Sequence, residues 1–455
     1  MSLKDIKKFL NNNLVFAVVV FLVCFIFSVL IPYYQVPDEF KHIGFIYQEL
    51  GSDIDISYES YAGGKDIALD LNKKFDIKNY DLKDKGPKLT LGTPKITVVG
   101  HLPQVAGILI GNVFKLPYAI TILLGEMFAA LFYAFFVYKT LKYYPYNELP
   151  FKLIMLLPIC IQQAGSFSYD VMLFSLSYLL IAYILHIKEK KPKFETKDMI
   201  YILLMLMGIA LVKIPYILLG VLIFLIPLKK YNLKIGKFVI NEDIIKKNKI
   251  FIIMAFIIIF ILGILVVKRI GEYNVLLAFL LNPIGLIKTI FFTLKEHVFG
   301  YVYTLVGNLA WLNIKTSYIY GIFIFLTYFI FMTCVKEEKK VNLSKRDKIF
   351  IFIFILIFFI IIQLALYDWT VRKVYNFEEF SNIEVLDKVK YISEHNIGVS
   401  GVQGRYFIPL LPLFSLLFVR TGKNKNTKIF KIYEIVYYII LVSYLAYVII
   451  NRFWI

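Results

Sequence analysis

Two adjacent carboxylates, Asp38 and Glu39, follow the first apolar run of the chain in the segment VPDEFKH. Pro37 stiffens the backbone just before them, and adjacent acids project in different directions, so we expect only one of the two to face a site. A carboxylate at a water-excluding interface can act as a general base that deprotonates a hydroxyl, or it can hold a divalent cation. The residues fit equally well a solvent-exposed helix start, where both acids interact favourably with the positive N-terminal end of the helix dipole.

A second polar group stands where a loop near the other end of the chain enters an apolar run, in GVQGRYFIPLLP. Arg405 presents paired donors that suit a phosphate, and Gln403 is placed to hydrogen-bond a sugar or phosphate oxygen. The neighbouring glycines allow a close backbone approach. An arginine that only snorkels to the membrane interface does not need them, so we favour a binding role. Lys213 has two equally good interpretations, as a partner of a phosphate or as a helix-end residue that snorkels to the interface.

The other candidate binding residues are polar or aromatic side chains next to apolar runs. His42 is more easily explained as structural than as a metal ligand, because no second histidine has suitable spacing. Trp311 is either a stacking surface for a sugar ring or an interfacial anchor. Glu126 lies inside an apolar run, where an ionisable side chain is costly; a functional role and a structural contact inside the bundle explain it equally well. The remaining candidates are His101, Gln104 and Asp170.

The composition indicates the medium in which these residues act. The 455 residues are 59% hydrophobic and 17% aromatic, with a mean hydropathy of +0.70, which excludes a soluble globular domain and a disordered chain. The 51 Lys and Arg exceed the 32 Asp and Glu by 19, but the basic residues form short clusters between apolar runs. That pattern is typical of cytoplasmic loops in a lipid bilayer and argues against nucleic acid as a partner.

The apolar runs and the loop charges predict an all-α polytopic integral membrane protein with about eleven transmembrane helices and a large first extracytoplasmic loop. Lysines near the start place the N-terminus in the cytoplasm. The expected order is a cytoplasmic N-terminus (1–13), a first span (14–33), an extracytoplasmic loop with the acidic motif (34–116), a bundle (117–267), an extracytoplasmic segment (268–316), a pair of spans (317–366), an extracytoplasmic loop (367–405) and a last pair (406–455).

Some finer expectations concern the bundle. Residues 151–165 and 250–267 are each expected to form one outward span. The apolar stretch 199–228 has lysine clusters at both ends, which requires an even number of crossings. Pro215 supplies a break, so we expect two short helices with Lys213 near their outer tip.

With this topology, acids and bases from separated segments gather at one face of the membrane. Such a convergence is what a site for an extracytoplasmic, anionic substrate requires. Chance scattering of polar residues at loop ends is the alternative.

Three motifs together, VPDEFKH, SFSYD and GVQGRYFIPLLP, resemble the bacterial membrane-protein family catalogued as domain of unknown function 2142, which itself looks like part of the class C glycosyltransferase superfamily. The resemblance covers nearly the whole chain. It implies a GT-C-like fold, a polyprenyl-phosphate-linked sugar as donor, and transfer at the outer face of a bacterial cell membrane. The acidic catalytic role falls on Asp38 or Glu39, while Asp170, Gln403 and Arg405 match other motif positions. The run GHLPQVAG departs from the expected PPLYY-like pattern, which leaves the roles of His101 and Gln104 open.

These observations predict a membrane glycosyltransferase that modifies a cell-envelope glycan or lipid-linked acceptor. No cofactor is required, although a divalent cation held by the acids stays open. A transporter or flippase for an anionic lipid-linked glycan, with Arg405, Lys213 and Glu126 as pathway charges, is the alternative. A non-catalytic scaffold of the envelope is a third class.

Overall fold

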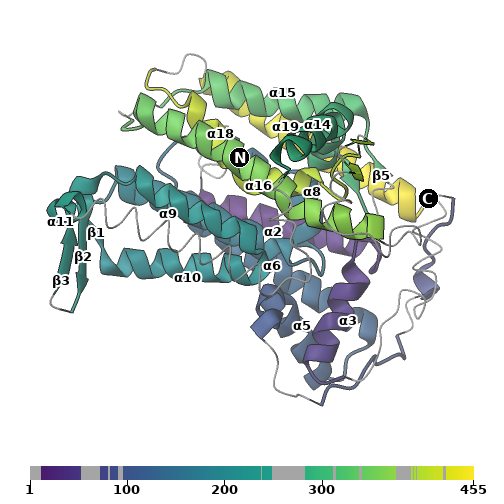
Figure 1. The fold of residues 1–455 in the computed structure, drawn as a ribbon. Helices are drawn as coiled ribbons and strands as arrows, with labels where there is room; N and C mark the ends of the chain where they lie inside the picture. Colours follow the sequence, from purple (N-terminus) through teal and green to yellow (C-terminus); the bar gives the residue numbers. More distant parts are fainter. Residues whose placement is uncertain are drawn as a thin grey trace.

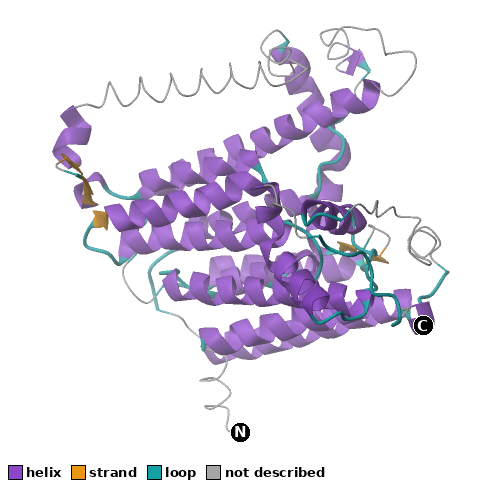
Figure 2. Cartoon of the chain, turned by 90° about the horizontal axis from the view of Figure 1, so that it is seen from below, coloured by secondary structure: helices purple, strands orange, loops and turns teal. Residues whose placement is uncertain are grey.

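The computed structural model describes residues 12–52, 72–79, 82–90, 96–236, 238–247, 282–310, 314–337, 341–375, 391–392, 394–395, 397–423 and 427–455. Within these residues the chain is mainly helical, and Figure 2 shows the long helices running side by side. A small sheet lies at one end of the bundle and the C-terminus at the other (Figure 1).

Long apolar helices form the frame of the molecule. Among the described residues, five helices are long and apolar enough to cross a membrane. They are α2 (Asn13–Leu30), α6 (Tyr118–Tyr143), α9 (Asp170–Glu189), the Lys345–Tyr367 part of α16 (Lys345–Tyr375), and the Lys428–Phe453 part of α19 (Thr427–Phe453). Shorter apolar helices are Val98–Val113, η3 (Ile214–Leu225), α15 (Tyr318–Cys334) and Gly404–Phe418, which comprises η6 (Gly404–Leu410) and α18 (Leu411–Phe418).

These helices confirm a mostly helical, multi-pass membrane protein. The number of eleven spans stays a prediction, and the expected span at 250–267 lies outside the described residues. α9 is the most deeply buried of these five helices, and it packs against α6 and α10 (Thr196–Val212).

The stretch 199–228 forms the expected hairpin. α10 ends at Val212, Lys213 takes an extended conformation with φ of −149°, and η3 returns along α10. Because β1 (Phe194–Glu195) connects α9 to α10 at the opposite end, the residues Asp170 and Lys213 fall at the same end of the bundle.

The expected single span over 151–165 is interrupted. The structure has α7 (Leu149–Met155) and α8 (Pro158–Ala164), because Pro158 cannot supply the backbone donor that a continuous helix needs. Both pieces are buried within the bundle. The break leaves α8 as a short element that ends beside the SFSYD segment.

The segment 34–116, expected to be a loop, contains more structure than that. It includes α3 (Glu39–Glu49), the 3-10 helices η1 (Ile77–Asn79) and η2 (Ile96–His101), and α5 (Leu102–Val113). α3 and α5 project together from the bundle at the end away from the sheet (Figure 1).

Short strands also add to the expected all-α architecture. The strands β1, β2 (Tyr231–Ile235) and β3 (Phe238–Asn241) form one sheet, and β4 (Asn308–Leu309) pairs with β5 (Ile314–Lys315). Within the sheet β1 and β2 are parallel, with Phe194 opposite Tyr231, and β2 and β3 are antiparallel. The remaining described elements are η4 (Leu228–Lys230), α11 (Glu242–Lys247) and α14 (Pro283–Val306).

Gly107 sets how closely α5 approaches α6. A Cβ atom at Gly107 would lie 2.4 Å from the backbone nitrogen of Gly125, and a backbone cannot move aside as a flexible side chain does. Gly107→Ala is therefore expected to lower the free energy of unfolding by about 1–3 kcal/mol. At Gly300 on α14 a Cβ meets nothing within 4 Å, so Gly300→Ala is the matched control and should cause no loss. Thermal unfolding in one detergent compares the two variants, and equal midpoints would contradict this account of the packing.

Candidate functional site

Three charged side chains from distant parts of the chain meet at the N-terminal end of α9. The Lys213 Nζ atom lies 2.7 Å from Asp170 Oδ1, and the Arg405 Nε atom lies 3.6 Å from Asp170 Oδ2. The Asp170 side chain is 2% exposed, against 17% for Lys213 and 11% for Arg405. Two cations and one anion leave a net positive charge in a nearly buried site, which attracts an anion. We call Asp170, Lys213 and Arg405 the charged cluster.

The local fold explains how these residues reach one point. Asp170 is the first residue of α9, where a negative carboxylate interacts favourably with the positive end of the helix dipole. Lys213 occupies the break between α10 and η3. Arg405 follows Gly404, where a Cβ would lie 2.2 Å from the Tyr301 carbonyl oxygen of α14. The sequence predicted that the glycines here allow a close backbone approach, and in the structure Gly404 allows η6 to approach α14.

Two tyrosines that the sequence analysis did not select complete the surroundings of Lys213. The Lys213 ammonium lies 4.8 Å from the ring centre of Tyr169 and 4.6 Å from that of Tyr406, within the range of cation–π attraction. The Arg405 guanidinium lies 5.5 Å from the Tyr406 ring. Each tyrosine is the direct neighbour of a predicted site residue, which is the signal that could have identified it.

Gln163 is the buried polar residue that sequence reasoning missed. Its Oε1 atom accepts a long hydrogen bond of 3.5 Å from Arg405, and its Nε2 atom has no hydrogen-bond partner. Arg405 Nε likewise has no hydrogen-bond partner. Donors left open beside a positive cluster suit an anion oxygen. The pair of glutamines within the apolar run PICIQQAG was the available sequence signal.

The two candidate histidines contact each other beside this cluster. The His42 Nδ1 and His101 Nε2 atoms are 3.1 Å apart, and the His42 ring meets the Tyr169 ring edge-on at 4.7 Å. Burial lowers the pKa of His42 to about 4, although Asp170 and Asp38 act in the opposite direction. His42 is therefore neutral at pH 7 and lies within electrostatic reach of both Asp38 and the charged cluster.

The adjacent acids at the start of α3 have different environments. Asp38, with a left-handed φ of 61°, has a 46% exposed side chain that pairs with Lys41 at 3.1 Å. Glu39 is 1% exposed, and its oxygens accept the backbone N–H groups of Phe167 at 3.1 Å and Val36 at 3.4 Å. Burial raises the pKa of Glu39 to about 7. Only Asp38 is therefore open to a substrate, whereas Glu39 fastens α3 to the SFSYD segment.

The remaining predicted site residues have structural contacts or lie outside the described residues. Gln104 is buried and its Nε2 atom donates to the Ser166 and Ser168 carbonyl oxygens at 3.2 and 3.1 Å, which shapes the SFSYD segment. The Gln403 carbonyl accepts the Tyr406 N–H group at 3.1 Å and so begins η6. Trp311 lies outside the described residues.

No group of three or more potential metal ligands occurs among the side chains that the structure describes. The described residues therefore provide no cluster of ligands for the divalent cation that the sequence left open.

His42 makes the stability of the protein sensitive to acid. Between its folded pKa of about 4 and its ordinary value of 6.5, the unfolded chain binds a proton that the folded chain does not. Its contribution to the free energy of unfolding therefore falls as the pH drops from 6.5 towards 4. Glu39 acts in the opposite direction between 4.5 and about 7. Thermal midpoints from pH 7.5 to 4.5 should thus fall less in His42→Gln than in the wild type, and equal slopes would contradict this role.

The fold and the charged cluster define a multi-pass helical membrane protein with a polar site at one end of its bundle. Residues 21–414 match the family described as predicted membrane protein (DUF2142), and the chain belongs to this family. The match includes every residue of the charged cluster and of the VPDEFKH motif. No curated protein and no solved structure matches the chain.

Proposed function

We propose that this protein is an integral-membrane glycosyltransferase. It transfers a sugar from a polyprenyl-phosphate-linked donor to a cell-envelope glycan or a lipid-linked acceptor at the outer face of the membrane. The observation that carries the proposal is the convergence of Lys213 and Arg405 on buried Asp170, with open donors on Arg405 and Gln163.

Lys213 and Arg405 take the role of phosphate binding. The bond between the anomeric carbon and the phosphate oxygen breaks with its electron pair on the oxygen, so negative charge grows on the phosphate. Fixed cations in a nearly buried site stabilise that charge better than water does. Asp170 holds both cations in place before the donor arrives.

Asp38 takes the role of general base. As the acceptor hydroxyl attacks the anomeric carbon, its proton passes to the Asp38 carboxylate and the new glycosidic bond forms. Asp38 is exposed, and it lies near enough to His42 to influence that ring, which in turn contacts Tyr169 of the cluster. His42, neutral at pH 7, adds no positive charge next to the base.

The distribution of lysines supports the assignment of the charged cluster to the outer face of the membrane. Lys188, Lys190, Lys191 and Lys193 lie where α9 ends, at the end of the bundle that carries β1, and Asp170 lies at the other end of the same helix. Lysine-rich ends face the cytoplasm in most membrane proteins. The N-terminus is then cytoplasmic and the charged cluster is extracytoplasmic.

Purified protein in liposomes tests the proposal with a panel of radiolabelled polyprenyl-phosphate sugars and envelope-glycan acceptors. One donor should give a new glycosidic product or slow hydrolysis, and Arg405→Gln should remove most of that turnover. If no donor of the panel is bound or turned over by folded wild-type protein, the glycosyltransferase proposal fails.

A transporter or flippase for an anionic lipid-linked glycan is the second candidate. It is favoured by the helix breaks at Lys213 and between α7 and α8, because transporters use discontinuous helices at their binding sites. Movement of a labelled lipid between leaflets without a new glycosidic bond would select this candidate.

A further inference from the structure

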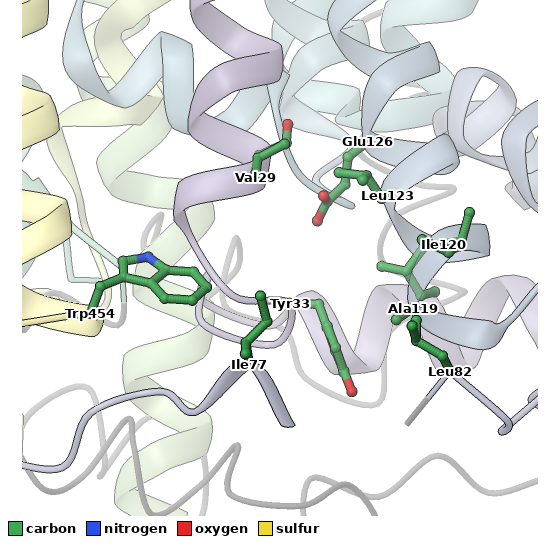
Figure 3. A pocket seen from close by; sticks show the side chains of 11 residues that line it. Val29, Tyr33, Ile77, Leu82, Ala119, Ile120, Leu123, Glu126 and Trp454 are labelled. Atoms are coloured by element: carbon green, nitrogen blue, oxygen red, sulfur yellow. The ribbon is translucent and has the colours of Figure 1, made fainter. Parts of the chain in front are cut away.

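A pocket separate from the charged cluster opens between α2, α6 and the C-terminal end of α19. It encloses about 270 Å³, and its walls are mostly apolar, including Val29, Ile120, Leu123 and Trp454. Figure 3 shows Glu126 of α6 extending its carboxyl group into this space. A carboxyl in an apolar pocket is costly and needs an explanation.

Glu126 is joined to a second buried carboxyl. The carboxyl groups of Glu126 and Glu39 lie within hydrogen-bonding reach of each other, and the two residues are 4% and 1% exposed. Two carboxylates in contact and shielded from water cannot both be charged, so the pair holds one proton.

The surrounding donors decide which carboxyl carries that proton. Glu39 already accepts backbone N–H groups from Phe167 and Val36, and such donors stabilise a carboxylate. Glu126 is then the protonated partner, which donates its O–H to Glu39. The ionisable residues nearest in sequence to Glu39 are Asp38, Lys41 and His42, and Tyr33 also lines the pocket.

The pocket rim connects this proton to the membrane phase. Val29 on α2 is 47% exposed and Ile120 on α6 is 38% exposed, and both helices are candidate membrane spans. Exposed apolar side chains on such helices face lipid. An apolar molecule can therefore reach Glu126 from the bilayer without crossing the charged cluster.

We propose that Glu39 and Glu126 form a proton-binding site whose protonated member, Glu126, is accessible from the lipid phase through this pocket. The proposal goes beyond the proposed sugar transfer and does not depend on it.

A hydrophobic carbodiimide, dicyclohexylcarbodiimide, is the direct probe, because it reacts with protonated carboxyl groups. The Glu126 O–H adds across one C=N bond: the carboxyl oxygen bonds to the central carbon and the proton moves to nitrogen. The product rearranges to a stable N-acylurea. Full-length protein in liposomes is treated at pH 7, and peptide mass spectrometry identifies the modified residue.

The expected result is a single adduct at Glu126 that is absent from Glu126→Gln. Glu434 on α19, also buried at 8% exposure but not part of the pocket wall, is an internal control that should stay unmodified. Ile120→Trp, which narrows the rim and leaves Glu126 in place, should reduce labelling at least tenfold. An unmodified Glu126 in the wild type, equal labelling of Glu434, or equal labelling by a water-soluble carbodiimide would each overturn the proposal.

Discussion

Asparagine in place of Asp38 is expected to lower the single-turnover rate of sugar transfer by about 10²- to 10⁴-fold, the usual contribution of a general base. The amide has nearly the shape of the carboxylate but cannot take the proton of the acceptor hydroxyl. Because Asp38 is 46% exposed and its ion pair with Lys41 is a surface pair, the loss of stability should stay within about 1 kcal/mol. The rate is measured by rapid mixing of donor-loaded protein with acceptor.

Lys41→Gln is the matched control for Asp38→Asn. It removes the same ion pair and leaves the base in place, so transfer should change only a few-fold. Equal losses in the two variants would mean that the ion pair matters and the base does not. Full activity in both Asp38→Asn and Glu39→Gln would eliminate the acidic motif as the source of the base.

Asp170→Asn is expected to lower the free energy of unfolding by about 3–5 kcal/mol, because it leaves two nearly buried cations without their counter-ion. Transfer should be lost as well, since Arg405 and Lys213 are no longer held towards the donor phosphate. Thermal and denaturant unfolding in detergent give the stability, and the transfer assay gives the activity.

A double-mutant cycle separates this electrostatic effect from a general disturbance of the fold. Adding Lys213→Gln to Asp170→Asn removes one of the stranded charges, so the double variant should be more stable than the sum of the single losses predicts. The exposed pair Glu242–Lys246 on α11 is the control, and its coupling is expected to be much smaller because water screens both charges. A similar coupling in both cycles would show that Asp170 does not hold the charged cluster together.

The sequence was sufficient for features that depend on local patterns. Pro215 predicted the break that places Lys213 at a helix end, and the lysine clusters on both sides of 199–228 predicted two helices there, which the structure has as α10 and η3. The adjacency of Asp38 and Glu39 predicted that only one of the two acids would face a site, and in the structure the two side chains have different environments, with Asp38 exposed and Glu39 buried. The predicted gathering of Asp170, Lys213 and Arg405 followed from topology alone, because it needed only the end of the bundle at which each residue falls.

Features that depend on side-chain contacts between distant segments could not be predicted in this way. Gln163 reaches Arg405 across 242 positions, and Glu39 reaches the Phe167 N–H group across 128. No periodicity or spacing connects such pairs. Pro158 was visible within the apolar run 151–165, but the run length alone suggested a continuous span, whereas the structure divides it into α7 and α8.

The most direct test of the account is equilibrium binding of a polyprenyl-phosphate sugar to the wild type, Arg405→Gln and Asp38→Asn in the same lipid. If the charged cluster recognises the donor phosphate, Arg405→Gln should weaken binding by about tenfold or more, as expected for loss of a charge-assisted contact, while Asp38→Asn should bind like the wild type. Wild-type affinity in folded Arg405→Gln would contradict the central claim, because the phosphate would then be held elsewhere in the protein.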